Sequence, residues 1–373
     1  MKVLHVVPTY VPAWRHGGPV LAVHGLCKAL AARGHEVTVF TTDVNGDERL
    51  DVPLAQPVRI DGVQAWYFPV RSARTSWSPA MGKALAEHTA GFDLVHLHSV
   101  FLWPTSAAAR AAERADVPYV LSPRGMLVPE LFAQRGRLRK TAWMLLAERR
   151  TIERAAALHM TSGLEATEAA RLGLPLPPAF VIPNGVDFEP DGVSREREPF
   201  LLFLGRVSWK KGLDHLVPAL ARVPGAALKI AGNDEEGLQP ELTRLAESAG
   251  VSPRVSFLGP VHGEEKASLL SRAAVLVLPS YSENFGNVVL EAMAAGCPVA
   301  VTPEVGLAET VRETGAGIVA DGDPTRLGEA LRDLLADPVR REEMGRRGRR
   351  AAERFSWPAV AEAMDAAYRR VAR

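Results

Sequence analysis

Two glutamates flank a predicted strand-to-helix turn in the last third of the chain, with seven residues between them. An apolar run at residues 275–278 predicts a buried strand, and the polar loop that follows it carries Glu283. A Phe-Gly pair comes next, and a helical pattern at residues 287–295 carries Glu291. Because carboxylates accept hydrogen bonds from hydroxyl groups, the two glutamates could hold a polyhydroxylated ligand at this turn.

The helix expected at residues 287–295 is apolar on nearly every side, which predicts that it is buried. A buried, unpaired carboxylate is costly, so Glu291 should meet hydroxyl, amide or cationic donors. Gly286 lets the backbone approach a ligand closely, and unbonded amides from Asn287 to Leu290 at the helix start would form an anion site. Such a turn suits a nucleotide diphosphate with a hydroxylated sugar at each end.

The extended motif at residues 282–299, Ser-Glu-Asn-Phe-Gly-Asn-x-x-x-Glu-Ala-Met-Ala-x-Gly-x-Pro-Val, strongly resembles that of the retaining family-4 (group 1) glycosyltransferases of the GT-B fold. The resemblance covers nearly the whole chain. It implies an α/β protein with two Rossmann-like, doubly wound domains that face a cleft, and a C-terminal helix that crosses back to the first domain. The expected parts are an acceptor-binding domain at 1–183, a linker at 184–199, a donor-binding domain at 200–355 and the crossover helix at 356–373.

Three basic residues follow the strand expected at residues 200–204. Arg206 and Lys211 match the family's paired cations, which hold the donor diphosphate and offset the charge that develops on the leaving group. Lys210 is expected to be solvated. The resemblance thus implies a metal-independent reaction with no cofactor, in which a nucleotide sugar is the co-substrate.

The resemblance also implies roles for the residues of the turn. Glu291 would accept hydrogen bonds from the nucleotide ribose, and Glu283 would lie near the hydroxyls and reacting face of the donor sugar, as a nucleophile or as an orienting group. Further donor-binding residues are expected at Asn284, Phe285, Gly286, Asn287 and Val288, and the amides from Phe285 to Val288 would contact sugar and phosphate. In the mechanism usually attached to the family, the departing phosphate accepts the proton of the acceptor hydroxyl.

Candidate residues in the first half follow its predicted strands, where ligands of parallel sheets bind. Gly17 and Gly18 precede a predicted helix, and family members place such a loop over the donor diphosphate when the domains close. His98 and Arg124 follow two later strands and are candidate acceptor-binding residues. His98 is also a candidate catalytic residue, although a lone histidine is more often structural.

Two further segments allow alternative interpretations. The basic stretch at residues 135–150 could be a solvated helix with one buried face, or an amphipathic contact with an anionic membrane that would suit a lipid-linked acceptor. Asp321 and Asp323 form an Asp-x-Asp pair like the metal site of another glycosyltransferase class. Because Pro324 follows, we instead expect Asp323 to cap a helix.

The composition limits the class of protein. With 373 residues, 47% hydrophobic residues and a net charge of +1, the chain is long enough for two globular domains and lacks the basic excess of a nonspecific nucleic-acid binder. Its two cysteines, Cys27 and Cys297, give no disulfide framework, and no signal peptide or apolar run long enough to span a membrane is evident. We therefore expect a cytoplasmic enzyme, with any membrane contact at the inner face.

Strands alternate with helical patterns, as in parallel sheets flanked by helices. The expected strands are residues 2–7, 36–41, 63–67, 94–97, 119–122, 157–161 and 180–182 in the first half, and 200–204, 227–231, 255–258, 275–278, 299–301 and 317–320 in the second. The expected helices include residues 19–33, 79–90, 104–115, 138–156, 287–295, 324–336, 339–354 and 358–371.

The leading hypothesis is a retaining transferase that moves a sugar from a nucleotide-diphosphate sugar to a hydroxyl of a saccharide or lipid-linked saccharide, in bacterial surface-polysaccharide assembly. The alternatives are a nucleotide-sugar epimerase of similar fold and a non-catalytic two-domain sugar-nucleotide binding protein. A dinucleotide dehydrogenase is disfavoured, because no Gly-x-Gly-x-x-Gly follows the first strand. The loops at Gly232 and Gly306 each lack a glycine that the family usually has, which leaves the nucleotide base open.

Overall fold

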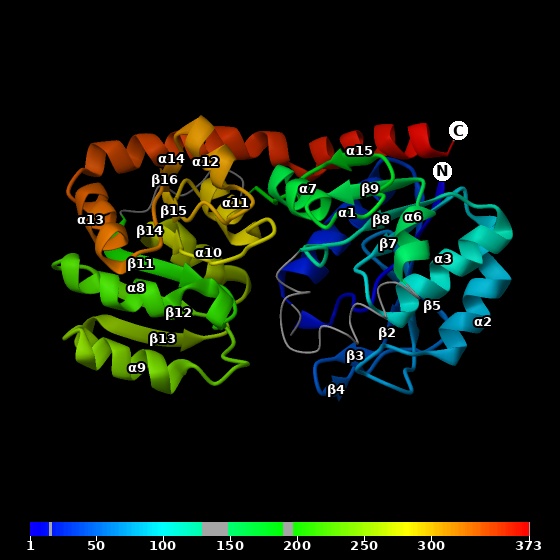
Figure 1. The fold of residues 1–373 in the computed structure, drawn as a ribbon, viewed down its shortest axis with the longest axis horizontal. Coiled ribbons are helices and arrows are strands. Elements are labelled where there is room, and N and C mark those ends of the chain that lie inside the picture. The colour runs from blue at the N-terminus through cyan, green and yellow to red at the C-terminus, as the bar shows by residue number, and fades with distance from the viewer. Residues whose placement is uncertain (15–16, 129–147, 189–196, 373) are drawn as a thin grey trace. The chain divides into compact units, whose positions relative to one another are not determined.

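The computed structural model describes residues 1–14, 17–128, 148–188 and 197–372. It consists of two compact units, one formed by Met1–Gly185 with Trp357–Arg373 and the other by Val186–Ser356 (Figure 1). Each unit contains one large sheet with helices packed against it. No helix within the described residues is long and apolar enough to cross a membrane.

The sheet of the first unit has eight strands in the order β10-β9-β8-β7-β1-β2-β6-β5. Neighbouring strands run parallel except β5 and β6, which pair antiparallel at one edge. The strands are β1 (Lys2–Val6), β2 (Glu36–Thr42), β5 (Pro57–Ile60), β6 (Val63–Phe68), β7 (Leu94–His98), β8 (Tyr119–Ser122), β9 (Ala157–Met160) and β10 (Ala179–Val181). A separate hairpin joins β3 (Val44–Asn45) and β4 (Glu48–Arg49).

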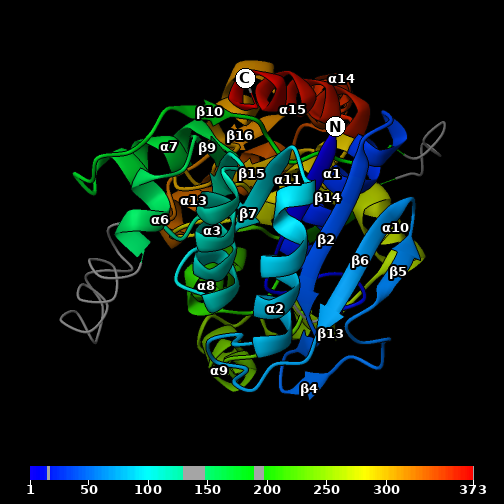
Figure 2. The ribbon, with the colours of Figure 1, turned by 90° about the vertical axis from the view of Figure 1, so that its right-hand side faces the viewer.

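Two helical layers cover this sheet, because the central strands are apolar toward both faces. One face packs on α2 (Pro79–His88), α3 (Trp103–Ala115), α6 (Arg149–Glu153) and α7 (Gly163–Ala170), of which α2 and α3 are prominent in Figure 2. The other face packs on α1 (Gly18–Ala32) and α15 (Trp357–Val371), which contact each other. The last helix of the chain therefore belongs to the first unit.

The indole of Trp357, the first residue of α15, explains why two of the positions that it contacts are glycines. A Cβ atom added to Gly25 of α1 would lie 2.1 Å from the Trp357 ring, and one added to Gly185 would lie 2.3 Å from it. The ring fills the space that both glycines leave open. The chain leaves the first unit at Gly185 and returns to it at Trp357, and these two residues pack against each other.

The second unit has six parallel strands in the order β13-β12-β11-β14-β15-β16, the arrangement of a doubly wound dinucleotide-type sheet. Its strands are β11 (Glu198–Leu204), β12 (Ala227–Ala231), β13 (Val255–Gly259), β14 (Ala273–Leu278), β15 (Val299–Val301) and β16 (Gly317–Val319). The order changes direction between β11 and β14. A crevice forms at such a point, outside the carboxyl ends of the strands, so the loops after these two strands are the expected ligand site.

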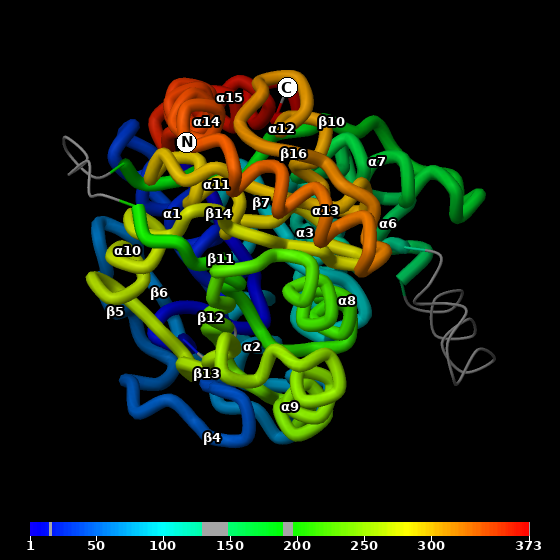
Figure 3. The backbone as a smooth tube through the Cα atoms, turned by 90° about the vertical axis from the view of Figure 1, so that its left-hand side faces the viewer, coloured from blue at the N-terminus to red at the C-terminus, as the bar shows by residue number. Residues whose placement is uncertain are grey.

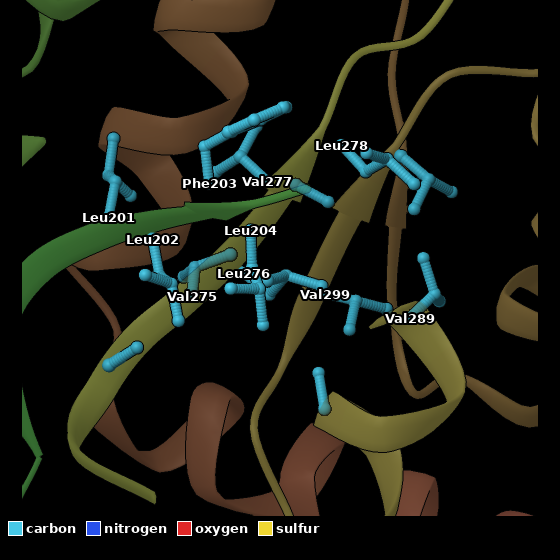
Figure 4. Close-up of a cluster of buried hydrophobic side chains, with 14 of the residues drawn as sticks. Leu201, Leu202, Phe203, Leu204, Val275, Leu276, Val277, Leu278, Val289 and Val299 are labelled. Atoms are coloured by element: carbon cyan, nitrogen blue, oxygen red, sulfur yellow. The ribbon is translucent and has the colours of Figure 1, made fainter. Parts of the chain in front are cut away.

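The helices of the second unit are α8 (Leu213–Ala219), α9 (Gln239–Ser248), α10 (Gly263–Arg272), α11 (Asn287–Ala294), α12 (Ala308–Thr314), α13 (Pro324–Leu335) and α14 (Pro338–Ala352). Figure 3 shows α8 and α9 on one side of β11, β12 and β13, with α10 on the other. Apolar side chains of β11, β14, β15 and α11 interlock in the core between them (Figure 4). This core holds the switch-point strands rigidly.

The strands and helices expected from the sequence are present wherever the structure describes them, with ends that differ by one or two residues, except that the helix expected to end at residue 156 ends at Glu153. The main difference is β5, which the polar alternation at residues 57–60 did not reveal and which makes the sheet of the first unit mixed at its edge. Most of the helix expected at 138–156 and most of the segment expected as a linker lie outside the described residues.

Candidate functional site

Three loops converge at the switch point of the second unit. A Cβ atom on Gly212 would lie 1.9 Å from the carbonyl oxygen of Pro279, so only glycine allows the loop after β11 to touch the loop after β14. Tyr281 N also donates to Lys210 O at 2.8 Å. On the other side, Gly232 lets the loop after β12 press on the carbonyl of Gly205. The basic loop and the glutamate loop are therefore locked together by their backbones.

Lys211 and Glu283 form an ion pair across these loops. Their side chains are only 17% and 19% exposed, so the pair is shielded from water more than a surface salt bridge is. The structure thus brings together one of the two predicted cations and one of the two predicted carboxylates. The ammonium of Lys211 could offset the charge that develops on a leaving group, while the carboxylate of Glu283 accepts hydrogen bonds from sugar hydroxyls.

The backbone around Glu283 is fixed by a neighbouring loop. Glu283 N donates to Glu304 O at 3.0 Å, and Gly306 N donates to Glu283 O at 2.8 Å. A Cβ atom on Gly306 would lie 2.1 Å from the carbonyl of Asn284, so glycine is required there. Glycine is also favoured at the cap of α11, because Gly286 has a φ of 90°.

The start of α11 offers fewer amides than expected. Val289 N and Leu290 N both donate to Gly286 O, at 2.8 and 3.4 Å, so the expectation that the amides from Asn287 to Leu290 are all unbonded was wrong for these two. The reason is that Gly286 is the N-cap of α11, and the carbonyl of an N-cap residue already accepts the first hydrogen bonds of the helix. Phe285 to Val288, which begin before the helix, remain the residues expected to contact a ligand.

Glu291 lies on the exposed stripe of α11 rather than in the core. Its side chain is 26% exposed, and Lys266 of α10 approaches it at 2.7 Å. The expected burial was wrong, because Asn287, Val288 and Ala295 share its partly exposed side of the helix while the core takes up the others. The desolvation argument for a ligand at Glu291 is therefore weaker than the sequence indicated, and Lys266 already supplies a cationic partner.

Arg206 stands apart from the Lys211–Glu283 pair. Its side chain is 61% exposed and lies 3.5 Å from Glu235, a contact at the limit of a salt bridge. Among the described residues, no contact joins it to Lys211 or Glu283. Val207 N donates to Asn233 O at 2.8 Å, which holds this stretch against the loop that carries Glu235. Lys210 lies over the ring of exposed Trp209 and makes no ion pair in the described part of the chain.

The glycine pair of the first unit sits at the start of α1. Gly17 caps the helix with a φ of 64°, and a Cβ atom added to it would meet nothing within 4 Å. Gly18 begins the helix, with Pro19 in its first turn. The preceding His16 lies outside the described residues. Open space beside helix amides is the geometry that a phosphate contact needs, and the first unit supplies it here.

His98 and Arg124 contact each other at the carboxyl ends of β7 and β8, where Arg124 Nη2 lies 3.3 Å from His98 Nδ1. His98 is 1% exposed, and its other ring nitrogen lies 3.0 Å from His5 Nδ1. Both nitrogens are therefore engaged, so His98 could touch a ligand only by releasing one partner. Arg124 also donates to Asn184 Oδ1 at 2.7 Å.

Four buried histidines line this side of the first sheet. Burial and, to a smaller extent, the nearby Arg124 guanidinium lower the pKa of His5 to about 3. Burial likewise lowers the pKa of His159 to about 3 and those of His96 and His98 well below the usual range, so all four rings are neutral at pH 7. The cause common to all is an apolar core with a cation next to it.

Three of these rings, those of His5, His96 and His98, place nitrogen atoms within 4.8 Å of one another, a grouping that could hold a metal ion. Hydrogen bonds already engage both nitrogens of His96 and His98 and one nitrogen of His5. The adjacent Arg124 guanidinium also repels a cation. The donor set therefore fits a hydrogen-bonded cluster better than a metal centre.

Other predicted features have simple structural roles. Asp323 Oδ1 accepts hydrogen bonds from Thr325 N and Arg326 N at 3.0 and 3.1 Å, which confirms that it caps α13. Of the basic stretch at 135–150, only residues 148–150 are described, and Arg149 and Arg150 pair with Glu153 and Glu113. The remainder of that stretch lies outside the described residues.

Sequence reasoning missed several contacting residues because each comes from a distant element. Lys266 lies on α10, His5 on β1 and Tyr368 on α15, and no local motif marks them. Histidines within otherwise apolar strands were the available signal, since a buried polar ring needs a partner. Asn184 lies in the Pro-Asn-Gly break that the sequence placed at the end of the first domain.

Comparisons with known proteins agree with this arrangement. The model for "Glycosyl transferases group 1" matches residues 187–351, and that for "Glycosyl transferase 4-like domain" matches residues 17–185. A D-inositol 3-phosphate glycosyltransferase of Xylanimonas cellulosilytica is 32% identical, over 93% of this chain and 90% of its own length.

Two solved structures show the same fold. Sucrose-phosphate synthase of Thermosynechococcus elongatus has a TM-score of 0.79 and 25% identity, covering 100% of this chain and 99% of that one. HepE of Anabaena, solved in complex with UDP and glucose, has a TM-score of 0.77 and 20% identity, covering 99% and 100%. These matches confirm the expected GT-B fold. With both halves of the chain matched and a relative above 30% identity along nearly all of it, this chain belongs to the group 1 glycosyltransferases.

Proposed function

We propose that this glycosyltransferase moves a sugar, with retention of anomeric configuration and without a metal ion, from a nucleotide-diphosphate sugar to a hydroxyl of a saccharide or lipid-linked saccharide in bacterial surface-polysaccharide assembly. The observation that carries the proposal is the Lys211–Glu283 pair at the switch point of the second unit, next to the start of α11. Cation, carboxylate and backbone amides there match the parts of a sugar diphosphate.

On the donor side, Lys211 takes the diphosphate as it leaves, together with the amides of Phe285 to Val288. Glu283 accepts hydrogen bonds from hydroxyls of the donor sugar, and Glu291 accepts them from hydroxyls of the ribose. Gly17 and Gly18 of the first unit contact the diphosphate, Gly18 through its amide, because Gly17 N already donates to Trp14 O at 3.1 Å. Supporting this assignment, the similar HepE binds UDP and glucose. Arg206 is exposed and turns from Glu235 to phosphate when the donor binds.

On the acceptor side, Arg124 is the direct contact and His98 supports it. The reason is geometric, since both ring nitrogens of His98 are already engaged. The backbone at these strand ends is under strain, because Ser99, Phe101 and Arg124 have φ values of 71°, 64° and 56°. Such left-handed non-glycine residues gather at functional sites.

A thermal-shift screen against UDP, GDP and ADP sugars tests the donor class. A ligand that binds the folded state raises its melting temperature, and one nucleotide should do so clearly. Repeating the screen with EDTA tests metal independence. No shift with any nucleotide sugar would contradict the proposal.

Product analysis separates the transferase from its alternatives. Incubated with the donor alone, an epimerase converts the sugar of the donor, whereas a binding protein leaves it unchanged. The transferase should release a nucleoside diphosphate at a rate that rises with acceptor, and the anomeric proton coupling in the NMR spectrum of the product should match that of the donor. An inverted product would overturn retention only.

Membrane contact forms a separate part of the proposal. The basic residues Arg137, Arg139 and Lys140 would bind anionic headgroups. Sedimentation with vesicles containing phosphatidylglycerol should be lost when all three are changed to serine and kept when Arg149 and Arg150, which have protein partners, are changed instead. Equal sedimentation of both variants would contradict it.

A further inference from the structure

We infer that Arg124 is the centre of a subsite for an anionic group of the acceptor, a phosphate or a carboxylate, and that His5 and His98 are positioning residues for it. The inference rests on the proposed function, since it names the chemical class of the acceptor. It makes the acceptor a sugar phosphate, a uronic acid or a phosphate-linked lipid rather than a neutral sugar.

The partners of the Arg124 guanidinium are neutral. It donates to Asn184 Oδ1 at 2.7 Å and to His98 Nδ1 at 3.3 Å, and within the described residues it makes no ion pair. Its Nε is buried and has no hydrogen-bond partner in that part of the chain. A guanidinium has five N–H donors and a permanent charge, so donors and charge are both left for an anion.

The carboxylate of Glu165, whose charge acts on Arg124, has other hydrogen-bond partners. Glu165 is buried, and its two oxygens accept from Gly125 N at 2.6 Å and from Thr161 N and Oγ1 at 2.6 and 2.9 Å. These bonds hold the backbone of the loop in which Arg124 adopts a φ of 56°. Glu165 therefore fixes the loop and lowers the cost of the buried cation by its field, but it leaves the guanidinium edge unoccupied.

The Arg124 guanidinium fixes the tautomers of His98 and His5. A guanidinium can only donate, so His98 Nδ1 must accept and its proton resides on Nε2. His98 Nε2 then donates to His5 Nδ1, which lies 3.0 Å away. His5 holds its own proton on Nε2. The ring of His98 thus always presents a lone pair to Arg124, and it does so because His5 accepts on the other side.

A second chain of hydrogen bonds anchors the same strands. His159 Nε2 donates to Ile182 O at 2.9 Å, so its Nδ1 accepts from Ser122 Oγ at 2.6 Å. Ser122 must then accept from His96 Nε2 at 2.8 Å, and His96 Nδ1 accepts from Tyr368 of α15 at 2.6 Å. The carbonyl of Ile182 can only accept, so it fixes the direction of every hydrogen bond in this series. This second series of hydrogen bonds anchors β7, which carries His98, and Ile182, which lies two residues before Asn184.

The direct test observes the unpartnered Arg124 Nε–H by proton–nitrogen NMR during titration with inorganic phosphate. The enzyme is saturated with the nucleoside diphosphate found in the donor screen, so that donor-site cations are occupied. The resonance, assigned by its loss in Arg124→Lys, should shift with phosphate. Arg150 Nε, which is exposed and paired with Glu113, is the internal control and should not follow it. An unmoved Arg124 resonance at millimolar phosphate would overturn the subsite.

Affinity measurements with charged and neutral probes then identify which class of anionic acceptor binds. Glucose 6-phosphate, glucuronate and a polyprenyl-diphosphate-linked sugar in micelles are each compared with glucose. At least one anionic probe should bind roughly 10- to 100-fold more tightly than glucose in wild type, and Arg124→Gln should lose that preference, as loss of a charge-assisted bond predicts. Equal binding of charged and neutral probes would contradict the inference.

The positioning role is tested on His5. His5→Asn keeps an acceptor for His98 and should retain the preference, whereas His5→Leu removes it and should lower the preference several-fold. Melting temperatures and nucleotide affinity are measured alongside. Unchanged preference in a folded His5→Leu would remove His5 from the account. If no variant binds a nucleotide, the proposed function fails instead, so the two failures are distinguishable.

Discussion

The two units treat their charges in opposite ways. In the second unit each charged candidate residue faces an opposite charge, as in Lys211 with Glu283, Glu291 with Lys266 and Arg206 with Glu235. In the first unit Arg124 faces a neutral imidazole and a neutral amide. The contrast indicates that a ligand of the second unit exchanges existing partners, whereas an anion at Arg124 meets an unneutralised cation.

This difference has an energetic consequence. A ligand that displaces an internal ion pair gains only the difference between the old and new contacts, so a large binding energy must come from several groups acting together. An anion at Arg124 adds a contact to a partly buried guanidinium whose solvation was already reduced on folding. The second unit is thus suited to selecting a large, polyvalent donor, and the first to recognising a single charged group.

The largest effect is expected at Lys211. Lys211→Ala should lower turnover by about 100- to 1000-fold, because it removes charge aimed at the leaving group from a shielded site and leaves Glu283 unpaired. Steady-state kinetics with the identified donor measure it. The matched control is Lys210→Ala, which removes a neighbouring ammonium stacked on Trp209 and should retain near wild-type turnover. Similar losses in both variants would break the distinction between them.

A smaller effect is expected at Glu291. Glu291→Ala should raise the donor KM by about 10- to 100-fold through lost ribose contacts, with little change in melting temperature, because the side chain is partly exposed. Lys266→Ala separates the contributions, since it removes the partner and leaves the carboxylate free for ribose. If Lys266→Ala weakened the donor as much as Glu291→Ala does, the ion pair itself would be what the enzyme needs.

The neutral histidine cluster predicts how stability depends on pH. Folding lowers the pKa of His5 and His159 to about 3, so between pH 6.5 and 3 the unfolded chain binds more protons than the folded one. The free energy of unfolding should therefore fall as pH drops below about 6.5, by up to about 1.4 kcal/mol per pH unit for each such histidine, and stay level above it.

Denaturant titrations between pH 7.5 and 5 measure this slope. His159→Asn should be less stable at neutral pH but should lose less stability on acidification. His262→Asn is the control, because that side chain is exposed in the second unit. A wild-type protein whose stability does not fall in this window would mean that the histidines are accessible and titrate normally.

The smallest effect is expected at Arg206. Its side chain is more than half exposed and its contact with Glu235 is long, so Arg206→Ala should raise the donor KM only about tenfold. Glu235→Gln removes the competing carboxylate and should lower that KM by about two- to threefold. Both changes should weaken at high salt, since the contact is screened. A loss at Arg206 as large as that at Lys211 would mean that the donor buries it.

The predictability of each site follows the same division. The donor residues lie in two contiguous stretches that each join one strand to one helix, so spacing and local pattern carried the information, as with Glu283 and Gly286. The environment of Arg124 is assembled from β1, β7, β9 and α15, which are adjacent only after the sheet forms. The local sequence around Arg124 therefore does not indicate which residues surround it.

Burial was the quantity that the sequence predicted least well. The pattern of α11 was so apolar that Glu291 was expected inside, but one stripe of an eight-residue helix is enough to bring it to the surface. His98 shows the reverse, because its place at a strand end indicated access and the structure buries it. Which face a residue lies on depends on tertiary packing, and the sequence pattern constrains that only on average.

The central claim is that a nucleotide-sugar diphosphate binds at the Lys211–Glu283 pair of the second unit. The most direct measurement is calorimetric titration of the nucleotide sugar found by the donor screen into wild type, Lys211→Ala and Lys210→Ala. We predict that Lys211→Ala weakens binding by at least about tenfold while Lys210→Ala binds like wild type. Equal affinities for all three proteins would contradict the claim.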